Sequence, residues 1–213
     1  MFRAVIFDLG GVVLGSPLHA IAAYERELAI AAGSVNRVVA DTGAEGAWGR
    51  LECGLIALSA FVPAFEAECA AAGFAIDARE MMERMAAASR PRPAMLTAIR
   101  ALRARGLRVA ALTNNWPSEE RDDGTRALRH HFDAFFESSA LGLQKPDPRI
   151  YRHACDALQI APAEAVFLDD IGRNLKTARA LGMTTIKVDT PEQALAELSG
   201  LVRFPLGDYE SGH

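Results

Sequence analysis

Five short, mostly apolar segments constrain what this chain can fold into. They are rich in β-branched and aromatic residues and are continuously apolar rather than alternating, which is typical of strands covered on both faces. The segments are residues 4–9, 107–113, 132–138, 165–169 and 184–188. Amphipathic helical patterns separate several of them, with proline or a capping residue at the start and glycine at the end. This alternation predicts an α/β fold built on a doubly wound parallel sheet.

The stretch between residues 16 and 89 interrupts this alternation, because its apolar residues follow helical spacing only. Phe61 and Phe65 illustrate that spacing, and no strand pattern occurs in the stretch. An insertion after the first strand lies over the carboxyl end of the sheet, where it can cover a site and select what enters. We therefore predict a core domain, residues 1–15 and 90–213, and an inserted α-helical cap subdomain, residues 16–89.

Composition narrows the class of protein. A length of 213 residues with 50% apolar content fits one core domain that carries an inserted subdomain. The net charge of -4, without a basic stripe, argues against a nucleic-acid partner, and no apolar run approaches membrane-spanning length. Cys53, Cys69 and Cys155 are odd in number and lie in apolar helical contexts, which predicts reduced thiols in a cytoplasmic protein.

Polar side chains stand where the apolar segments end. Asp8, Thr113, Asp169 and Asp170 close three of the segments, and Lys145 follows a fourth. Because ligands bind in the crevice outside the carboxyl ends of parallel strands, we expect these five side chains to form one site. Three carboxylates, one ammonium and one hydroxyl indicate a site for a metal ion and an anion.

Four ordered motifs carry a resemblance to a known family. They are FDLGGVV from Phe7, LTNN from Leu112, GLQKPDPRIY from Gly142 and FLDDIGRN from Phe167. The chain resembles the haloacid dehalogenase (HAD) superfamily, in the branch whose helical cap follows the first motif. The motifs are similar to those of the N-terminal phosphatase domain of soluble epoxide hydrolases and of bacterial sugar-phosphate phosphatases. The resemblance implies a Rossmann-like core and a phosphatase that hydrolyses a small phosphorylated metabolite.

The resemblance also implies roles for individual residues. Asp8 matches the family's nucleophile, which attacks phosphorus and forms an aspartyl-phosphate that water later hydrolyses. Lys145 matches the residue that adds a positive charge beside the nucleophile and the transferring phosphoryl group. Thr113 and the backbone amide of Asn114 are expected to hold phosphate oxygens by hydrogen bonds.

A magnesium ion is the implied cofactor. Three neighbouring carboxylates cannot all stay ionised without a cation, and Mg²⁺ prefers hard oxygen ligands. By the resemblance, the ligands are Asp8, Asp170 and the carbonyl of Gly10. Asp169 is expected to act as a further ligand or to orient the others.

Gly10 departs from the family pattern, because the phosphatases generally carry an aspartate two residues after the nucleophile. That aspartate protonates the leaving group, and general acid help is worth ~10² to 10⁴ in rate. We therefore expect substrates with good leaving groups, such as acyl, aryl or anomeric phosphates, to be favoured. His19 or Glu52 of the cap could supply a replacement acid.

Two other functions stay open. A haloacid dehalogenase-type hydrolase would use Asp8 to displace halide without a metal, although the Asp169–Asp170 pair favours phosphate chemistry. A weakly catalytic protein that binds a phosphorylated ligand is the second alternative, and the retention of Thr113 and Lys145 weighs against it. The alanine-rich cap helices could also pack against a second subunit, which leaves a homodimer open.

Overall fold

A parallel sheet of five strands forms the centre of the molecule. The computed structural model describes residues 1–116 and 125–206. The strands pair in the order β3-β2-β1-β4-β5, all in parallel. They are β1 (Ala4–Phe7), β2 (Arg108–Thr113), β3 (Ala134–Glu137), β4 (Ala165–Asp169) and β5 (Thr184–Lys187). The predicted α/β parallel fold is confirmed, and the five apolar segments are its strands.

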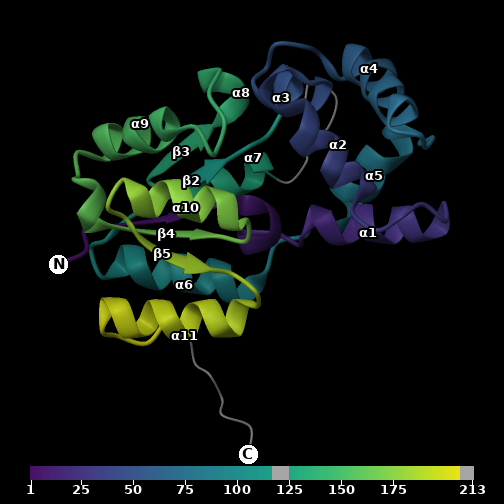
Figure 1. The fold of residues 1–213 in the computed structure, drawn as a ribbon. Helices are drawn as coiled ribbons and strands as arrows, with labels where there is room; N and C mark the ends of the chain where they lie inside the picture. The colour runs from purple at the N-terminus through teal and green to yellow at the C-terminus, as the bar shows by residue number, and fades with distance from the viewer. Residues whose placement is uncertain (117–124, 207–213) are drawn as a thin grey trace, which may run out of the picture.

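Helices cover both faces of the sheet (Figure 1). On one face lie α6 (Pro93–Ala104) and α11 (Pro191–Val202), and on the other lie α9 (Pro148–Leu158) and α10 (Gly172–Ala180). Alternate residues of β1 therefore enter different clusters: Phe7 packs with the first pair of helices and Ile6 with the second. Because both faces are buried, the strands are continuously apolar in sequence.

Short elements complete the core. They are the tight helical turn Leu9–Val13, α7 (Thr125–Leu128), α8 (Ser138–Leu141) and the 3₁₀ turns Arg129–His131 and Pro162–Glu164. The start of α9 is fixed locally, because Asp147 accepts a hydrogen bond from the Arg149 amide and Pro148 occupies the first helical position. This N-terminal helix cap directly follows the turn that carries Lys145.

The five helices of the cap form a separate apolar cluster beside the carboxyl ends of the strands (Figure 1). Phe61, Phe65 and Met81 are fully buried in that cluster. The helices are α1 (Pro17–Glu27), α2 (Ser34–Thr42), α3 (Ala47–Glu52), α4 (Leu58–Ala71) and α5 (Ala78–Ala88), with a 3₁₀ turn at Gly43–Glu45. The boundaries of the two domains at residues 15 and 90 stay a prediction.

The chain leaves the core for the cap and returns from it along two adjacent linkers. Leu14 and Pro91 form an antiparallel bridge, and the Gly15 amide donates to the Arg90 carbonyl at 2.9 Å. A Cβ atom on Gly15 would lie 2.2 Å from the carbonyl oxygen of Ala88, so glycine permits this close approach. Within the described residues, no helix is both long and apolar enough to cross a membrane.

Candidate active site

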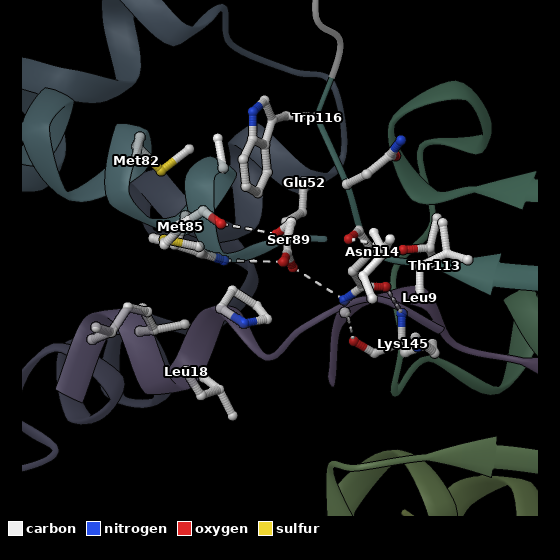
Figure 2. A pocket seen from close by; sticks show the side chains of 18 of the residues that line it. Leu9, Leu18, Glu52, Met82, Met85, Ser89, Thr113, Asn114, Trp116 and Lys145 are labelled. Atoms are coloured by element: carbon white, nitrogen blue, oxygen red, sulfur yellow. Dashed lines mark hydrogen bonds between the residues drawn. The ribbon is translucent and has the colours of Figure 1, made fainter. Parts of the chain in front are cut away.

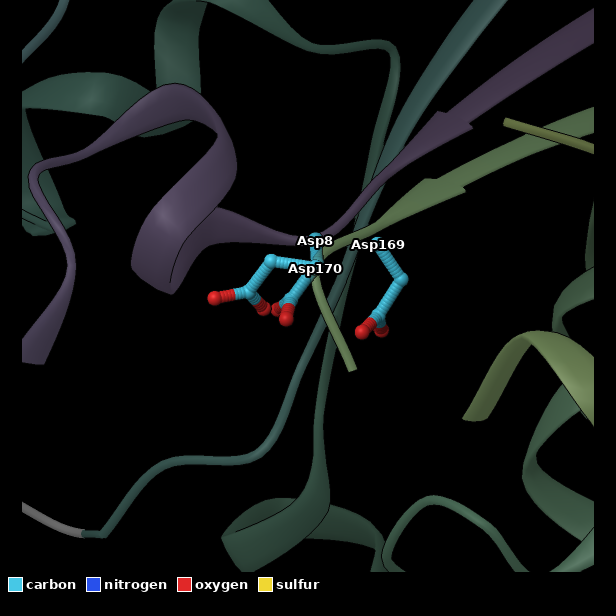
Figure 3. A group of neighbouring side chains, drawn as sticks. All are labelled: Asp8, Asp169 and Asp170. Carbon is cyan, nitrogen blue, oxygen red and sulfur yellow. The ribbon is translucent and has the colours of Figure 1, made fainter. Parts of the chain in front are cut away.

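The carboxyl ends of β1 and β4 bring three carboxylates together. Asp8 follows β1, Asp169 ends β4 and Asp170 comes next, and Figure 3 shows the three side chains beside one another. One carboxylate oxygen from each lies within 4.8 Å of the others. Thr113 ends the neighbouring strand β2 and is buried. The structure therefore brings these strand-end side chains to one edge of the sheet.

Lys145 lies between two of these carboxylates. Its Nζ is 2.9 Å from Oδ1 of Asp8 and 2.7 Å from Oδ2 of Asp169, and its side chain is 1% exposed. Burial alone would lower the pKa of this ammonium, but the two carboxylates outweigh burial and raise the pKa above its ordinary value. Lys145 is therefore a permanent positive charge beside Asp8.

Asp169 is fully buried, and both of its oxygens have partners. Besides Lys145, it accepts hydrogen bonds from the Ile171 amide at 2.7 Å and from the Asn174 side-chain amide at 3.2 and 3.1 Å. Of the two roles expected for Asp169, this geometry favours orienting Lys145. Sequence reasoning missed Asn174, whose one signal is its place in the first turn of α10, five residues beyond Asp169.

Asp8 keeps one oxygen free of these contacts. The Leu9 amide donates to Oδ1 at 2.7 Å, and Lys145 contacts the same oxygen. Among the described residues, no hydrogen-bond donor reaches Oδ2. That oxygen is thus available to attack a substrate or to bind a cation.

The site has an excess of negative charge. Burial raises the pKa of Asp8 to about 8 against the opposing charge of Lys145, and burial together with Asp169 raises the pKa of Asp170 to about 6. Three clustered carboxylates with one ammonium thus retain a proton unless a further cation is bound. The clustered donors of Asp8, Asp169 and Asp170 are all hard oxygen atoms, so the residues present fit a magnesium ion.

These shifts predict how the stability of the metal-free protein depends on pH. Asp8 has its pKa raised from 3.8 to about 8 on folding, so within that range the folded state binds more protons than the unfolded chain. Stability should therefore fall as pH rises through this range. In EDTA, we expect the midpoint of thermal unfolding of the wild type to fall between pH 6 and pH 9. This fall should exceed the fall in Asp8→Asn by at least about 2 °C. An equal pH dependence in the two proteins would contradict the raised pKa.

Two adjacent glycines differ in what the structure demands of them. Gly11 has φ of +76°, and a Cβ atom there would lie 2.0 Å from Oδ2 of Asp170, so any other residue would strain the backbone and displace Asp170. Gly10 has φ of -62°, and a Cβ atom would meet only the Pro17 ring, at 3.4 Å. The missing acid at Gly10 is therefore not imposed by the backbone or by lack of space.

The Asn114 side chain connects the strand end to the Lys145 segment. Its Oδ1 accepts a hydrogen bond from the Lys145 amide at 2.8 Å, and its Nδ2 donates to the Lys145 carbonyl at 3.0 Å. The same Nδ2 donates to Oε2 of Glu52, on α3 of the cap, at 3.0 Å. The side chain of Asn114 thus positions the segment that carries Lys145, and the expected phosphate contact falls to its backbone.

A cavity of about 680 Å³ opens above these residues, between the strand ends and the cap (Figure 2). Asp8, Thr113, Lys145 and Asp170 line its floor. Much of the wall is apolar and includes Leu18, Ile21, Val39, Met82, Met85 and Trp116. Of the two replacement acids considered from the sequence, Glu52 lines this cavity, whereas His19 is exposed and does not line it.

The same residues fall within a match to a known family. A sequence profile described as haloacid dehalogenase-like hydrolase matches residues 2–182, which include Asp8, Thr113, Lys145, Asp169 and Asp170. The chain belongs to the haloacid dehalogenase-like hydrolases. This membership confirms the resemblance drawn from the four motifs.

Two curated relatives match this hydrolase over most of its length, and a third matches part of it. Acyl-CoA dehydrogenase family member 10 from Mus musculus is 37% identical over 208 residues, covering 96% of this chain and 20% of the relative. Bifunctional epoxide hydrolase 2 from Sus scrofa is 36% identical over 210 residues, covering 92% and 38%. The chain thus spans well under half of either relative. A phosphoserine phosphatase from Thermus thermophilus is 39% identical over 89 residues, covering 41% of this chain and 36% of the relative.

Solved structures share the fold of this HAD-like hydrolase. A HAD family enzyme from Bacteroides thetaiotaomicron, in complex with magnesium and inorganic phosphate, has a TM-score of 0.60 at 18% identity, covering 88% of this chain and 94% of that one. An L-2-haloacid dehalogenase from Xanthobacter autotrophicus has a TM-score of 0.60 at 24% identity, covering 97% and 85%. At these identities the likeness concerns the fold alone.

Proposed function

We propose that this HAD-like hydrolase is a magnesium-dependent phosphatase that acts on a small phosphorylated metabolite through an aspartyl-phosphate on Asp8. One observation carries the proposal: the buried Lys145 ammonium contacts Asp8 and Asp169, and Asp170 lies beside them, so three neighbouring carboxylates share one ammonium. A site with this excess of negative charge gains from a divalent cation, and a bound cation in turn attracts a phosphate dianion. Phosphatases and a magnesium–phosphate complex among the similar proteins support the same chemistry.

Each residue at the strand ends would have a defined part in the reaction. A carboxylate oxygen of Asp8 attacks phosphorus while the bond to the leaving-group oxygen breaks on the opposite side. Lys145 keeps Asp8 oriented and offsets charge on the transferring group, and Thr113 with the Asn114 amide holds phosphate oxygens. Water then hydrolyses the acyl phosphate and restores Asp8. Magnesium, held by Asp8, Asp170 and the Gly10 carbonyl, would supply charge neutralisation when bound.

The dehalogenase alternative rests on the fold shared with the Xanthobacter enzyme. In that chemistry Asp8 would displace halide, and no cation is needed to bring the substrate to the carboxylate. The pairing of Asp170 with Asp169 in a cluster that retains a proton has no use in such a reaction. A weakly catalytic phosphate-binding protein is disfavoured because Asp8 keeps a free oxygen in the pocket.

Metal removal tests the proposal. We expect phosphate release from a panel of phosphorylated metabolites to fall by at least ~10² in EDTA and to return when Mg²⁺ is added in excess, because magnesium neutralises the reacting anions. Phosphate release and halide release would be measured on the same preparation. Hydrolysis of haloacids that persists in EDTA, with no phosphate released under any condition, would reject the phosphatase in favour of the dehalogenase.

Four further expectations from the sequence stay predictions. They are the absence of a nucleic-acid partner, the absence of membrane association, a cytoplasmic location and a possible homodimer.

A further inference from the structure

Glu52 is a carboxylate of the cap that reaches the core side of the pocket. Trp48 Nε1 donates to its Oε1 at 3.0 Å and Asn114 Nδ2 donates to its Oε2 at 3.0 Å. Its backbone carbonyl accepts a hydrogen bond from Ser138 Oγ at 2.6 Å. Figure 2 shows the side chain between Trp116 and Asn114. Contacts from the cap and from the core thus fix this carboxyl group in the cavity.

The position of Glu52 matches the side on which a leaving group would depart. In an in-line displacement the leaving group lies opposite the attacking oxygen of Asp8, and therefore points away from the strand ends toward the cap. Glu52 projects from the cap and bonds to Asn114, the residue after Thr113. Glu52 thus lines the same cavity as Asp8 and Thr113, and it enters that cavity from the cap.

The surroundings of Glu52 also suit an acid. Burial raises its pKa above the ordinary value for glutamate, while the hydrogen bonds from Trp48 and Asn114 and the charges of Lys145 and Arg173 oppose that rise. Burial outweighs these opposing contacts, so Glu52 keeps its proton to a higher pH than an exposed glutamate. A carboxyl group that keeps its proton to a higher pH is better suited to act as a general acid.

We propose that Glu52 is the acid that protonates the leaving group, in place of the side chain that Gly10 lacks. The inference rests on the proposed phosphatase function. As the bond from phosphorus to the ester oxygen breaks, the carboxyl proton of Glu52 passes to that oxygen and the alcohol departs. The Glu52 carboxylate then takes a proton from the water that attacks the aspartyl-phosphate. Inorganic phosphate leaves, and both Asp8 and Glu52 regain their starting forms.

The decisive variant is Glu52→Gln, assayed with Mg²⁺ on an alkyl phosphate and on p-nitrophenyl phosphate. Glutamine keeps the size of the side chain and can still accept a hydrogen bond from Asn114, but it has no proton to give. We expect kcat for the alkyl ester to fall by ~10² to 10⁴ and kcat for the aryl ester to fall less than about tenfold, because nitrophenolate leaves without protonation. The loss of wild-type alkyl turnover at high pH should also disappear in the variant. Thermal unfolding and the retained aryl activity show that the variant is folded.

Gly10 offers a matched rescue, because a side chain fits there without backbone strain. In the Glu52→Gln background, Gly10→Asp should raise kcat for the alkyl ester at least about tenfold, because it supplies an acid from the core. Gly10→Ala adds the same Cβ atom without a carboxyl group and should return none. Rescue by aspartate alone separates proton donation from any effect on the Asn114 contact.

Several outcomes would overturn the inference. Equal losses on the alkyl and aryl esters in Glu52→Gln, or no loss on either, would show that Glu52 does not protonate the leaving group. A wild type confined to aryl and acyl phosphates would show that the protein has no such acid. If the wild type forms an aspartyl-phosphate on Asp8 and one of these outcomes is found, the inference alone fails. If it neither hydrolyses any phosphate ester nor becomes phosphorylated at Asp8, the proposed function fails with it.

Discussion

Replacing Asp8 with asparagine is expected to reduce phosphate release by at least about 10⁴-fold, because removing the nucleophile from a catalytic unit abolishes most of its rate enhancement. The asparagine amide cannot form the acyl phosphate, and it offers a weaker metal ligand. Steady-state phosphate release with Mg²⁺ measures the loss. After incubation with an acyl phosphate donor and quenching with acid, only the wild-type protein should carry covalently bound phosphate.

The stability of the same variant supplies its control. Asp8 is buried, and its pKa is raised because the ionised form is poorly solvated. Asp8→Asn should therefore unfold at a temperature no lower than that of the wild type in EDTA, while Lys145 keeps its contact with Asp169. Full phosphatase activity in a folded Asp8→Asn protein would end the proposed mechanism.

Replacing Lys145 with methionine is expected to cause the largest loss of stability. The ammonium is buried between Asp8 and Asp169, at 2.9 and 2.7 Å, so methionine removes the positive charge that both buried carboxyl groups contact. Breaking such a buried pair costs roughly 3 to 5 kcal/mol. For a chain of this size, that free energy corresponds to a fall of at least about 6 °C in the midpoint of thermal unfolding. Phosphate release should be lost as well.

Lys176→Met is the matched control for this variant. Lys176 lies exposed on α10, and its replacement should change the free energy of unfolding by less than about 0.5 kcal/mol. The penalty of Lys145→Met should also shrink at low pH, where the carboxylates take up protons and no longer need a counter-charge. Equal effects of the two lysine substitutions on the unfolding midpoint would show that the buried ion pairs contribute nothing to the fold.

The sequence predicts the fold well because strands that are buried on both faces are continuously apolar, and that pattern is visible in the sequence. The β4 segment Ala165–Asp169 is buried throughout and was predicted with its observed bounds. The first strand ends two residues earlier than expected, at Phe7. There the Asp8 side chain accepts a hydrogen bond from the Leu9 amide and starts a tight turn, a local contact that apolar character does not reveal.

The candidate site was predictable as a set of residues and less so as a set of contacts. Strand ends meet at one edge of a parallel sheet, so Asp8 and Asp170 could be placed together from topology alone. The contact between Glu52 and Asn114 joins residues 62 positions apart and depends on how the cap lies over the core. Likewise, the left-handed backbone of Gly11 and the approach of Asp170 distinguish this glycine from its replaceable neighbour, and both appear only in the structure.

The two tryptophans of the chain lie on opposite sides of the junction between cap and core. Trp48 belongs to α3, Trp116 follows β2, and their rings meet edge to face with centroids 6.2 Å apart. The fluorescence emission of an indole depends on its immediate environment, and both indoles lie at the contact between cap and core. Tryptophan fluorescence is therefore expected to report any change in the contact between cap and core, without an attached dye.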